Sequence, residues 1–442
     1  MIFERKATAL LKQWKESCNG TYAALLEGPR RVGKSTIAEQ FAKSNYKSYI
    51  KIDFSNITPR ALSVFDSIAD LDEFFLRLQA VTGVVLHRRK SAIIFDEIQL
   101  QPKVRQAIKY LVADGRYDYI ETGSLLSIKK NVRNIVIPSE ERKIPVYPMD
   151  YEEFLLANGK TSFDVLREIF ERKKPIGQDV NRKLLRDFRT YLAVGGMPQA
   201  VEAFVQKKSF KEIDSVKRGI IDLYKDDFFK IDPSGRISML FDSIPSQLAR
   251  TTKQFSLHFA LKKKLSSKDE ELLSDLINSR TVLRCYNCAD PTISLSQGKR
   301  LDEFKLYMAD SGLFVTQLLK TGVITDNLLY DKLLSDKLPA NLGFLYENIV
   351  AQTLAARGKD LYYMSWPKPN STHSYELDFL IGKGPKISPV EVKSSRTDQH
   401  HSLDEFIRKY SSIAKDPCIL SQKDIGKDKA IHLYPFYLTA FI

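Results

Sequence analysis

The sequence has no uninterrupted run of about 18 apolar residues, the length that a membrane-spanning helix needs. Its first residues, Met1 to Lys6, lack the apolar core of a signal peptide. Cysteine is scarce as well, with four in 442 residues, as is usual for proteins of a reducing compartment. We therefore expect a cytoplasmic protein that has no membrane partner.

The chain also lacks the ligand set of a zinc site. Cys285 and Cys288 form the one suggestive spacing, but no second C-x-x-C pair and no H-x-x-x-H accompanies them. We interpret the two cysteines as small residues of a strand, in preference to a ligand pair.

Positive charge is abundant. The 68 Lys and Arg residues outnumber the 54 Asp and Glu residues, which gives a net charge of +14. Such an excess favours a polyanionic partner, most often nucleic acid, although solubility alone can account for a basic surface. We expect DNA as a partner, and the length of the chain predicts three or four domains.

One glycine-rich stretch fits the pattern G-x-x-x-x-G-K-[ST]. Residues 22–26 before it are typical of a buried strand, and residues 37–42 after it of a helix, which is the order that a phosphate-binding loop requires. A chance glycine-rich turn is the alternative. The predicted nucleotide-binding residues are Gly28, Pro29, Arg30, Arg31, Val32, Gly33, Lys34, Ser35 and Thr36.

The chemistry of this loop follows from its residue types. Backbone N–H groups at the start of the helix would cradle the phosphates of ATP, and glycine allows their close approach. Lys34 would reach the β- and γ-phosphates, and the Ser35 hydroxyl would bind Mg²⁺.

A second apolar run, residues 91–98, ends in two acids. A buried parallel strand would carry Asp96 to its carboxyl end, where Asp96 can hold Mg²⁺ and Glu97 can activate the attacking water. A strand that ends in surface acids is the alternative. Residues 117–124 predict a further strand, at whose end Thr122 and Ser124 are either sensors of the γ-phosphate or a turn and a helix cap.

The middle of the chain turns helical. Asp150 and Glu153 have the spacing of a helix N-cap with a capping box. Gly195 and Gly196 precede Pro198, and we interpret them as a sharp interdomain turn. Three short helices and two strands over residues 236–325 predict a winged helix, with Lys262, Lys263 and Lys264 contacting DNA phosphates. A winged helix that only joins domains is the alternative.

The last part of the chain predicts a helix over residues 342–356 and strands at 361–366, 375–381 and 390–393. Glu391 and Lys393 lie two apart on a strand and so share a face. With Asp378 on the preceding strand and Glu347 on the helix, they would form a nuclease centre in which Asp378 and Glu391 hold a metal. A retired site that keeps its acids for structure or for DNA binding is the alternative.

These stretches together resemble a prokaryotic family of AAA/STAND-type P-loop ATPases that carry a winged helix and a C-terminal DUF4143 domain related to PD-(D/E)xK nucleases. The resemblance runs nearly from end to end and includes Walker A and Walker B motifs. It rests on Gly28–Thr36, Ile94–Gln99, Thr122–Ser124, Tyr191–Pro198, Lys305–Leu313, Asp378 and Glu391-x-Lys393.

The resemblance implies an α/β fold, with a P-loop NTPase parallel sheet followed by a helical and winged-helix region and a C-terminal α/β domain like restriction endonucleases. We expect an ATPase domain over 1–160, a helical linker over 161–235, a winged helix over 236–325 and the nuclease-like domain over 326–442. ATP and Mg²⁺ are the expected cofactors, with a second Mg²⁺ or Mn²⁺ in the last domain.

One departure concerns the Gly-Arg pair that is usual in the family, which is Glu141-Arg142 here. Arg142 stays a candidate for facing the phosphates, as do Arg30 and Arg31. Our first hypothesis is an ATPase whose nucleotide state controls DNA engagement. The alternative is a nucleotide-dependent switch without DNA, acting as a homo-oligomer or on a protein partner.

Overall fold

The computed structural model describes residues 1–18, 20–123, 138–160, 162–250, 252–262, 265–320, 330, 332–335, 343–394 and 397–442. They form two compact units. The N-terminal unit comprises Met1–Tyr147 with Asn278–Arg280, and the C-terminal unit comprises Pro148–Ile277 with Thr281–Ile442. No helix within these described ranges combines the length and the apolarity needed to span a bilayer.

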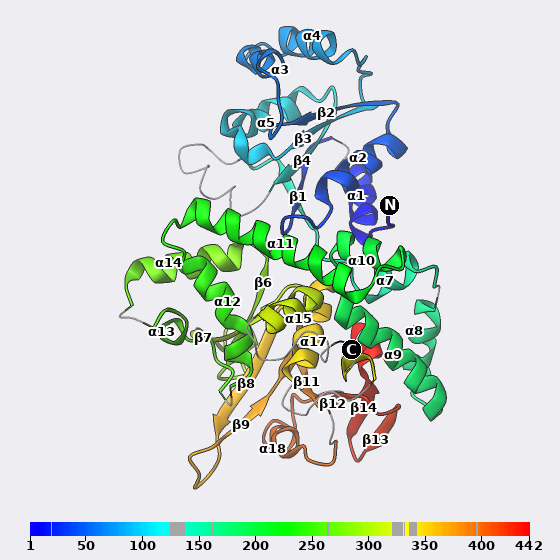
Figure 1. Ribbon diagram of the computed structural model, residues 1–442, viewed down its shortest axis with the longest axis vertical. Coiled ribbons are helices and arrows are strands. Elements are labelled where there is room, and N and C mark those ends of the chain that lie inside the picture. The colour runs from blue at the N-terminus through cyan, green and yellow to red at the C-terminus, as the bar shows by residue number, and fades with distance from the viewer. Residues whose placement is uncertain are drawn as a thin grey trace. The chain divides into compact units, whose positions relative to one another are not determined.

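The N-terminal unit is built on a sheet of five parallel strands in the order β2-β3-β4-β1-β5 (Figure 1). The strands are β1 Ala23–Glu27, β2 Ser48–Asp53, β3 Ser91–Asp96, β4 Asp118–Gly123 and β5 Glu141–Pro145. Strand β4 lies between β1, which leads into the phosphate loop, and β3, which ends at Asp96. This added strand is the arrangement that the sequence predicted for a P-loop NTPase.

Helices cover both faces of this sheet, which is why β1, β3 and β4 are buried throughout. Strands β1 and β3 are mostly apolar, whereas β4 also carries Asp118, Glu121 and Thr122. Leu25 joins an apolar cluster with α4 and α5, whereas its neighbour Leu26 joins a second cluster with α1 and α2. The described helices of the unit are α1 Lys6–Cys18, α2 Lys34–Asn45, α3 Pro59–Leu62, α4 Leu71–Thr82 and α5 Pro102–Asp114, with 3-10 turns η1 Ser63–Ser67 and η2 Ile98–Leu100.

The C-terminal unit begins with helices, labelled in green in Figure 1. They are α7 Tyr151–Ala157, α8 Phe163–Arg172, α9 Gln178–Val194, α10 Pro198–Val205, α11 Phe210–Ile231, α12 Arg236–Leu248, α13 Leu257–Leu261 and α14 Ser267–Asn278. The predicted capping box is confirmed, because Asp150 accepts from the Glu153 N–H at 3.0 Å and Glu153 accepts from the Asp150 N–H at 2.9 Å.

The predicted glycine turn is present, between α9 and α10. Gly195 has φ 82°, and a Cβ on Gly196 would lie 2.0 Å from the carbonyl oxygen of Met149. The Gly196 N–H donates to Asp310 at 2.6 Å. The turn therefore packs tightly inside the C-terminal unit, so the interdomain part of the prediction needs correction.

A four-stranded sheet in the order β7-β6-β8-β9 follows. It consists of β6 Val282–Cys288, β7 Lys299–Met308, β8 Leu361–Pro367 and β9 Ser374–Leu377. Strands β6 and β7 form the predicted hairpin, and Cys285 and Cys288 are buried on β6 as strand residues. The free edge expected of a wing is absent from β6, however, because β8 pairs with it. This one sheet therefore contains strands from both sides of the boundary predicted between residues 325 and 326, where the winged helix was to end and the nuclease-like domain to begin.

The remaining sheet has the order β10-β11-β12-β14-β13. Its strands are β10 Phe379–Lys383, β11 Lys386–Val392, β12 Cys418–Ser421, β13 Gly426–Asp428 and β14 Ile431–Pro435, and helices α15 Ser311–Lys320, α17 Phe344–Ala356, α18 His401–Lys409 and the turn η4 Phe436–Phe441 complete the unit. The strand predicted over 375–381 is divided at Asp378, where the chain leaves the four-stranded sheet at β9 and enters the five-stranded sheet at β10.

Candidate functional site

The predicted phosphate loop runs from the end of β1 to the start of α2. Its glycines are needed for two different reasons. Gly33 has φ 97°, a left-handed conformation in which side chains are strained. Gly28 has no room for a side chain, since a Cβ there would lie 2.2 Å from the carbonyl oxygen of Val146.

Lys34 lies folded back into this loop and is buried. Its Nζ donates to the carbonyl oxygens of Gly28 and Pro29, each at 2.9 Å. Arg5 braces the loop from outside, donating from Nη1 to the Val32 carbonyl at 2.9 Å. The role of Arg5 was missed from the sequence, because no motif connects it with a loop more than twenty residues later.

Asp96 brings the predicted metal-binding groups together at the carboxyl end of β3. Its Oδ1 accepts from the Ser35 hydroxyl at 2.7 Å and also from the Thr122 hydroxyl. A carboxylate beside a hydroxyl at this edge is a set of hard oxygen donors that fits Mg²⁺. Thr122 is therefore positioned at the site, while Ser124 lies outside the described residues.

Glu97 follows in a left-handed conformation, with φ 56°, which is uncommon for a residue with a side chain. Its N–H donates to the Thr122 hydroxyl at 3.2 Å, and its carboxylate accepts from the Gln99 amide. Two hydrogen bonds thus fix this residue beside Asp96, and strained backbone of this kind is frequent at functional sites.

Lys51 on β2 is a member of the site that sequence reasoning missed. Its Nζ donates to Glu39 at 2.9 Å and lies 3.6 Å from Oδ2 of Asp96. Burial alone would lower the pKa of Lys51, but its hydrogen bond to Glu39 and the charge of Asp96 outweigh burial, so the pKa is raised. Lys51 therefore stays charged next to the predicted Mg²⁺ ligand.

The three predicted arginines lie in different surroundings. Arg30 and Arg31 belong to the phosphate loop itself, where Arg31 is exposed with φ 66°. Arg142 is exposed on β5 opposite Ala24, three residues before β1 ends at Glu27. This register sets Arg142 back from the carboxyl edge where the phosphates would bind, so the structure does not support a phosphate-facing role for it.

Glu141, the departure noted next to Arg142, has an internal partner. Its two carboxylate oxygens accept from Nε and Nη2 of Arg105 on α5, at 2.8 and 2.7 Å, and both side chains are buried. The acid that replaces the usual glycine therefore ties β5 to α5.

The predicted nuclease residues do not gather in one place. Asp378 shares its surroundings with Glu347, whose charge acts on it, and its Oδ2 accepts from the Val392 N–H at 2.8 Å. Glu391 is instead paired with Lys393 at 2.6 Å, and the other charges near it are those of His400 and Asp404.

The predicted metal cluster is therefore split in two. Among the described residues, no group of three or more His, Cys, Asp or Glu side chains is placed so that it could hold a metal ion. The reason lies in the backbone, because Asp378 occupies the step between two sheets whereas Glu391 lies within β11.

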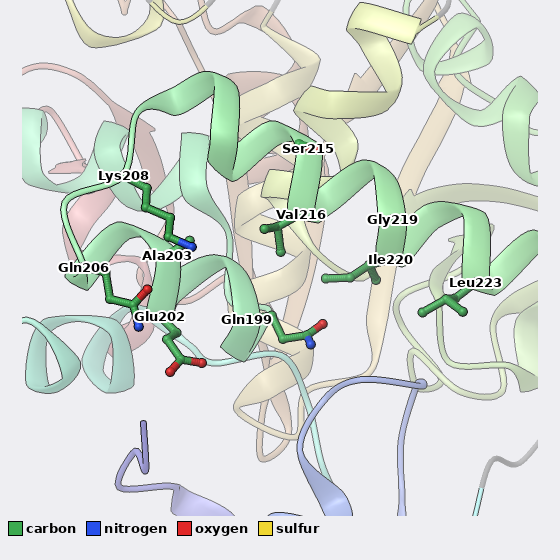
Figure 2. A pocket seen from close by; sticks show the side chains of 10 residues that line it. All are labelled: Gln199, Glu202, Ala203, Gln206, Lys208, Ser215, Val216, Gly219, Ile220 and Leu223. Atoms are coloured by element: carbon green, nitrogen blue, oxygen red, sulfur yellow. The ribbon is translucent and has the colours of Figure 1, made fainter.

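A hollow of about 350 Å³ lies between α10 and α11 in the C-terminal unit (Figure 2). Polar side chains such as Glu202, Gln206 and Lys208 lie at one end, and Val216 and Ile220 of α11 line the other part. No predicted site residue lines this hollow, and we assign it no role.

Comparison with known protein families gives three matches along the chain. The AAA domain family matches residues 21–155, and a domain of unknown function, DUF8612, matches residues 185–323. A second domain of unknown function, DUF4143, matches residues 342–436. The order of the AAA and DUF4143 matches is the one that the sequence motifs indicated. No curated protein matches the chain.

Among solved structures, the Walker-type ATPase PABY2304 of Pyrococcus abyssi is 16% identical with a TM-score of 0.43, over 72% of this chain and 96% of that one. Cdc6p from Pyrobaculum aerophilum is 11% identical with a TM-score of 0.24, over 75% and 94% of the two chains. A STAND protein, PH0952 from Pyrococcus horikoshii, is 10% identical with a TM-score of 0.29, over 81% of this chain and 49% of its own. Likenesses this distant assign no activity.

Proposed function

We propose that this chain, whose residues 21–155 match the AAA domain family and residues 342–436 match DUF4143, is a P-loop ATPase whose nucleotide state controls the engagement of DNA by the C-terminal unit. The observation that carries the nucleotide part is the meeting of three groups on Asp96, namely the hydroxyls of Ser35 and Thr122 and the ammonium of Lys51. A bound Mg²⁺ would neutralise charge on the phosphates of ATP.

Each group of the site has a distinct task in this proposal. Lys34, released from the loop carbonyls, binds the phosphates, while Ser35 and Asp96 hold the Mg²⁺. Glu97 accepts the proton of the attacking water, and its hydrogen bond with Gln99 keeps the carboxylate oriented.

Glu97→Gln tests this assignment. We expect the variant to bind ATP normally and to hydrolyse it about a hundredfold or more slowly, since a positioned general base contributes roughly 10²–10⁴-fold. The matched control is Glu16→Gln, at an exposed position of α1 in the same unit, which should hydrolyse ATP like the wild type. If Glu97→Gln turned over ATP at the wild-type rate, Glu97 would not be the base.

The DNA part of the proposal is supported by charge. The net charge is +14, and three helices precede the β6–β7 hairpin in the region predicted to contact phosphates. Of the lysines named for this role, Lys262 lies at the end of α13, while Lys263 and Lys264 lie outside the described residues.

The test is steady-state ATP hydrolysis by the full chain, with and without duplex DNA, at low and high salt. We expect DNA to stimulate hydrolysis at low salt and the stimulation to fade at high salt, because contacts to phosphates release counterions. Hydrolysis that is indifferent to DNA at both salt concentrations would overturn the DNA part and leave the ATPase intact.

A nucleotide-dependent switch without DNA is the second candidate function. The pairing of β8 with β6 favours it, because a hairpin held inside a four-stranded sheet is less free to act as a wing in the minor groove. Such a switch would act on a protein partner or through self-association. Binding to a second copy that changes between ATP and ADP, with no affinity for duplex DNA, would favour it over the first proposal.

A further inference from the structure

Five charged side chains meet in the C-terminal unit around the position where the sequence predicted a metal centre. We call them the lysine–carboxylate cluster, and they are Lys253, Lys305, Glu347, Glu376 and Asp378. Lys305 has 0% exposed side chain and that of Lys253 is 23% exposed. The two lysines were not predicted to take part in this site.

Lys253 lies between the two carboxylates that were predicted to serve a metal. Its Nζ donates to Oε1 of Glu347 and lies 3.9 Å from Oδ1 of Asp378. The Tyr307 hydroxyl reaches the other Glu347 oxygen at 3.5 Å. Both oxygens of Glu347 therefore face a donor from this chain.

Lys305 neutralises a third carboxylate. Its Nζ donates to Oε1 of Glu376 at 2.6 Å. Since a buried carboxylate needs a partner charge or a proton, the two lysines satisfy two of the three acids. Asp378 is the third acid; its Oδ1 lies 3.9 Å from the Lys253 ammonium, and its Oδ2 accepts from the Val392 N–H.

A divalent cation does not fit this arrangement. Mg²⁺ and Mn²⁺ need several free oxygen ligands, yet Glu347 is bound by Lys253 and Oδ2 of Asp378 by the Val392 N–H. The remaining predicted ligand, Glu391, is paired with Lys393. Lys393 therefore neutralises Glu391, the acid that was predicted to bind the metal together with Asp378.

We propose that Lys253 occupies the place of a divalent cation between Glu347 and Asp378, so that the C-terminal unit carries a metal-free centre that does not cut nucleic acid. The two lysines come from the DUF8612 match and the three acids from the DUF4143 match. The cluster therefore joins these two matched stretches by ion pairs. This inference is independent of the ATPase, because every residue in it belongs to the C-terminal unit.

Mn²⁺ titration followed by calorimetry tests the proposal. All proteins carry Asp96→Asn, which removes the predicted metal ligand of the N-terminal unit, and no nucleotide is added. We expect the background protein and its Asp378→Asn variant to give the same isotherm. Lys253→Met should gain Mn²⁺ affinity by at least about tenfold, because it removes a positive charge about 4 Å from a carboxylate.

Two further variants make the result specific. Lys253→Arg keeps the charge and should bind Mn²⁺ no better than the background protein, and the double change Lys253→Met with Asp378→Asn should lose the gain. Mn²⁺ binding by the background protein that disappears in Asp378→Asn would overturn the proposal, and this comparison does not require Lys253→Met to fold. A folded Lys253→Met that gains no Mn²⁺ binding would count against it as well.

DNA cleavage gives a second readout. We expect supercoiled plasmid to be nicked by the wild-type chain with Mn²⁺ no faster than by Asp378→Asn purified in the same way. Nicking that is present in the wild type and lost in Asp378→Asn would overturn the proposal.

Discussion

Lysines meet carboxylates in both units of this protein, but with opposite consequences. In the N-terminal unit, Lys51 stands at the edge of the sheet with 28% of its side chain exposed, and Asp96 keeps hydroxyl neighbours that a metal can share. In the lysine–carboxylate cluster, Lys253 is 23% exposed and Glu347 is 6% exposed, close to the 28% of Lys51 and the 5% of Asp96. The difference is that the Lys253 ammonium donates directly to Glu347 and that Lys305 is fully covered. Similar charges thus leave an open set of predicted metal ligands in one unit and a closed ion-pair network in the other.

The difference teaches that the type of residue is a poor guide to metal binding when the neighbours are unknown. A carboxylate that accepts from hydroxyls retains capacity for a cation, whereas one that accepts from an ammonium has its charge already neutralised. Burial makes a carboxylate–ammonium pair harder to separate, because separation would leave an uncompensated charge away from water.

Lys34→Ala should have the largest effect on the open site. We expect ATP binding to fall below detection and hydrolysis to drop on the order of a thousandfold, since Lys34 binds the β- and γ-phosphates in this proposal. The fluorescence of a labelled ATP analogue measures the binding. The control is Lys43→Ala on the exposed last turn of the same helix α2, which should bind ATP like the wild type.

Lys305→Met should have the largest effect on the closed cluster. It leaves Glu376, whose side chain is 31% exposed, without its ammonium partner beside the buried Glu347 and Asp378. Breaking a fully buried ion pair costs about 3–5 kcal/mol, and the exposure of Glu376 lowers the expected cost below that range. Thermal unfolding should show a lower midpoint for the C-terminal unit, with ATP binding retained by the N-terminal unit. Lys359→Met, at an exposed position of the same unit, should leave the midpoint unchanged. An unchanged midpoint in Lys305→Met would mean that the cluster contributes no stability.

The pH dependence of stability should also distinguish the two sites. The pKa of Asp378 is raised to about 7, so the folded chain binds this proton more tightly than the unfolded chain. The group therefore stabilises the fold at low pH, and the contribution is lost as pH rises through about 7. We expect the unfolding midpoint of the C-terminal unit to fall between about pH 4 and pH 7 more steeply in the wild type than in Asp378→Asn. Parallel profiles would contradict the raised pKa.

Lys51→Met should give the smallest change. Removal of a positive charge 3.6 Å from Asp96 should lower the half-saturating Mg²⁺ concentration for nucleotide binding by a few-fold, because Lys51 is partly exposed and solvent screens it. Glu39→Gln removes the other partner of Lys51, so Lys51 pairs with Asp96 alone. This variant should therefore raise the half-saturating Mg²⁺ concentration. Shifts in the same direction for both variants would show a general disturbance of the site.

Features coded by neighbours in the sequence could be predicted. The phosphate loop, the acids after β3 and the capping box of α7 each depend on residues within one short stretch, and the structure brings Ser35, Asp96 and Thr122 together. The parallel sheet followed from apolar runs at regular intervals.

Features that depend on contacts through space could not be predicted. Lys51 and Lys253 carry no motif, and Lys305 begins a stretch of the resemblance that assigned it no role. Each lysine reaches its carboxylate from a distant part of the chain. Strand alternation related Glu391 to Lys393 correctly, but it did not foresee the step at Asp378 between two sheets. The pairing of β6 with β8 was missed for the same reason, since the two strands are separated by more than seventy residues.

The most direct test of the comparison is an electron paramagnetic resonance titration of the wild-type chain with Mn²⁺ in the presence of a non-hydrolysable ATP analogue. We predict a single tight Mn²⁺ site, which is lost in Asp96→Asn and retained in Asp378→Asn. A tight site that survives Asp96→Asn and disappears in Asp378→Asn would contradict the account, because the metal would then bind in the cluster that we describe as closed.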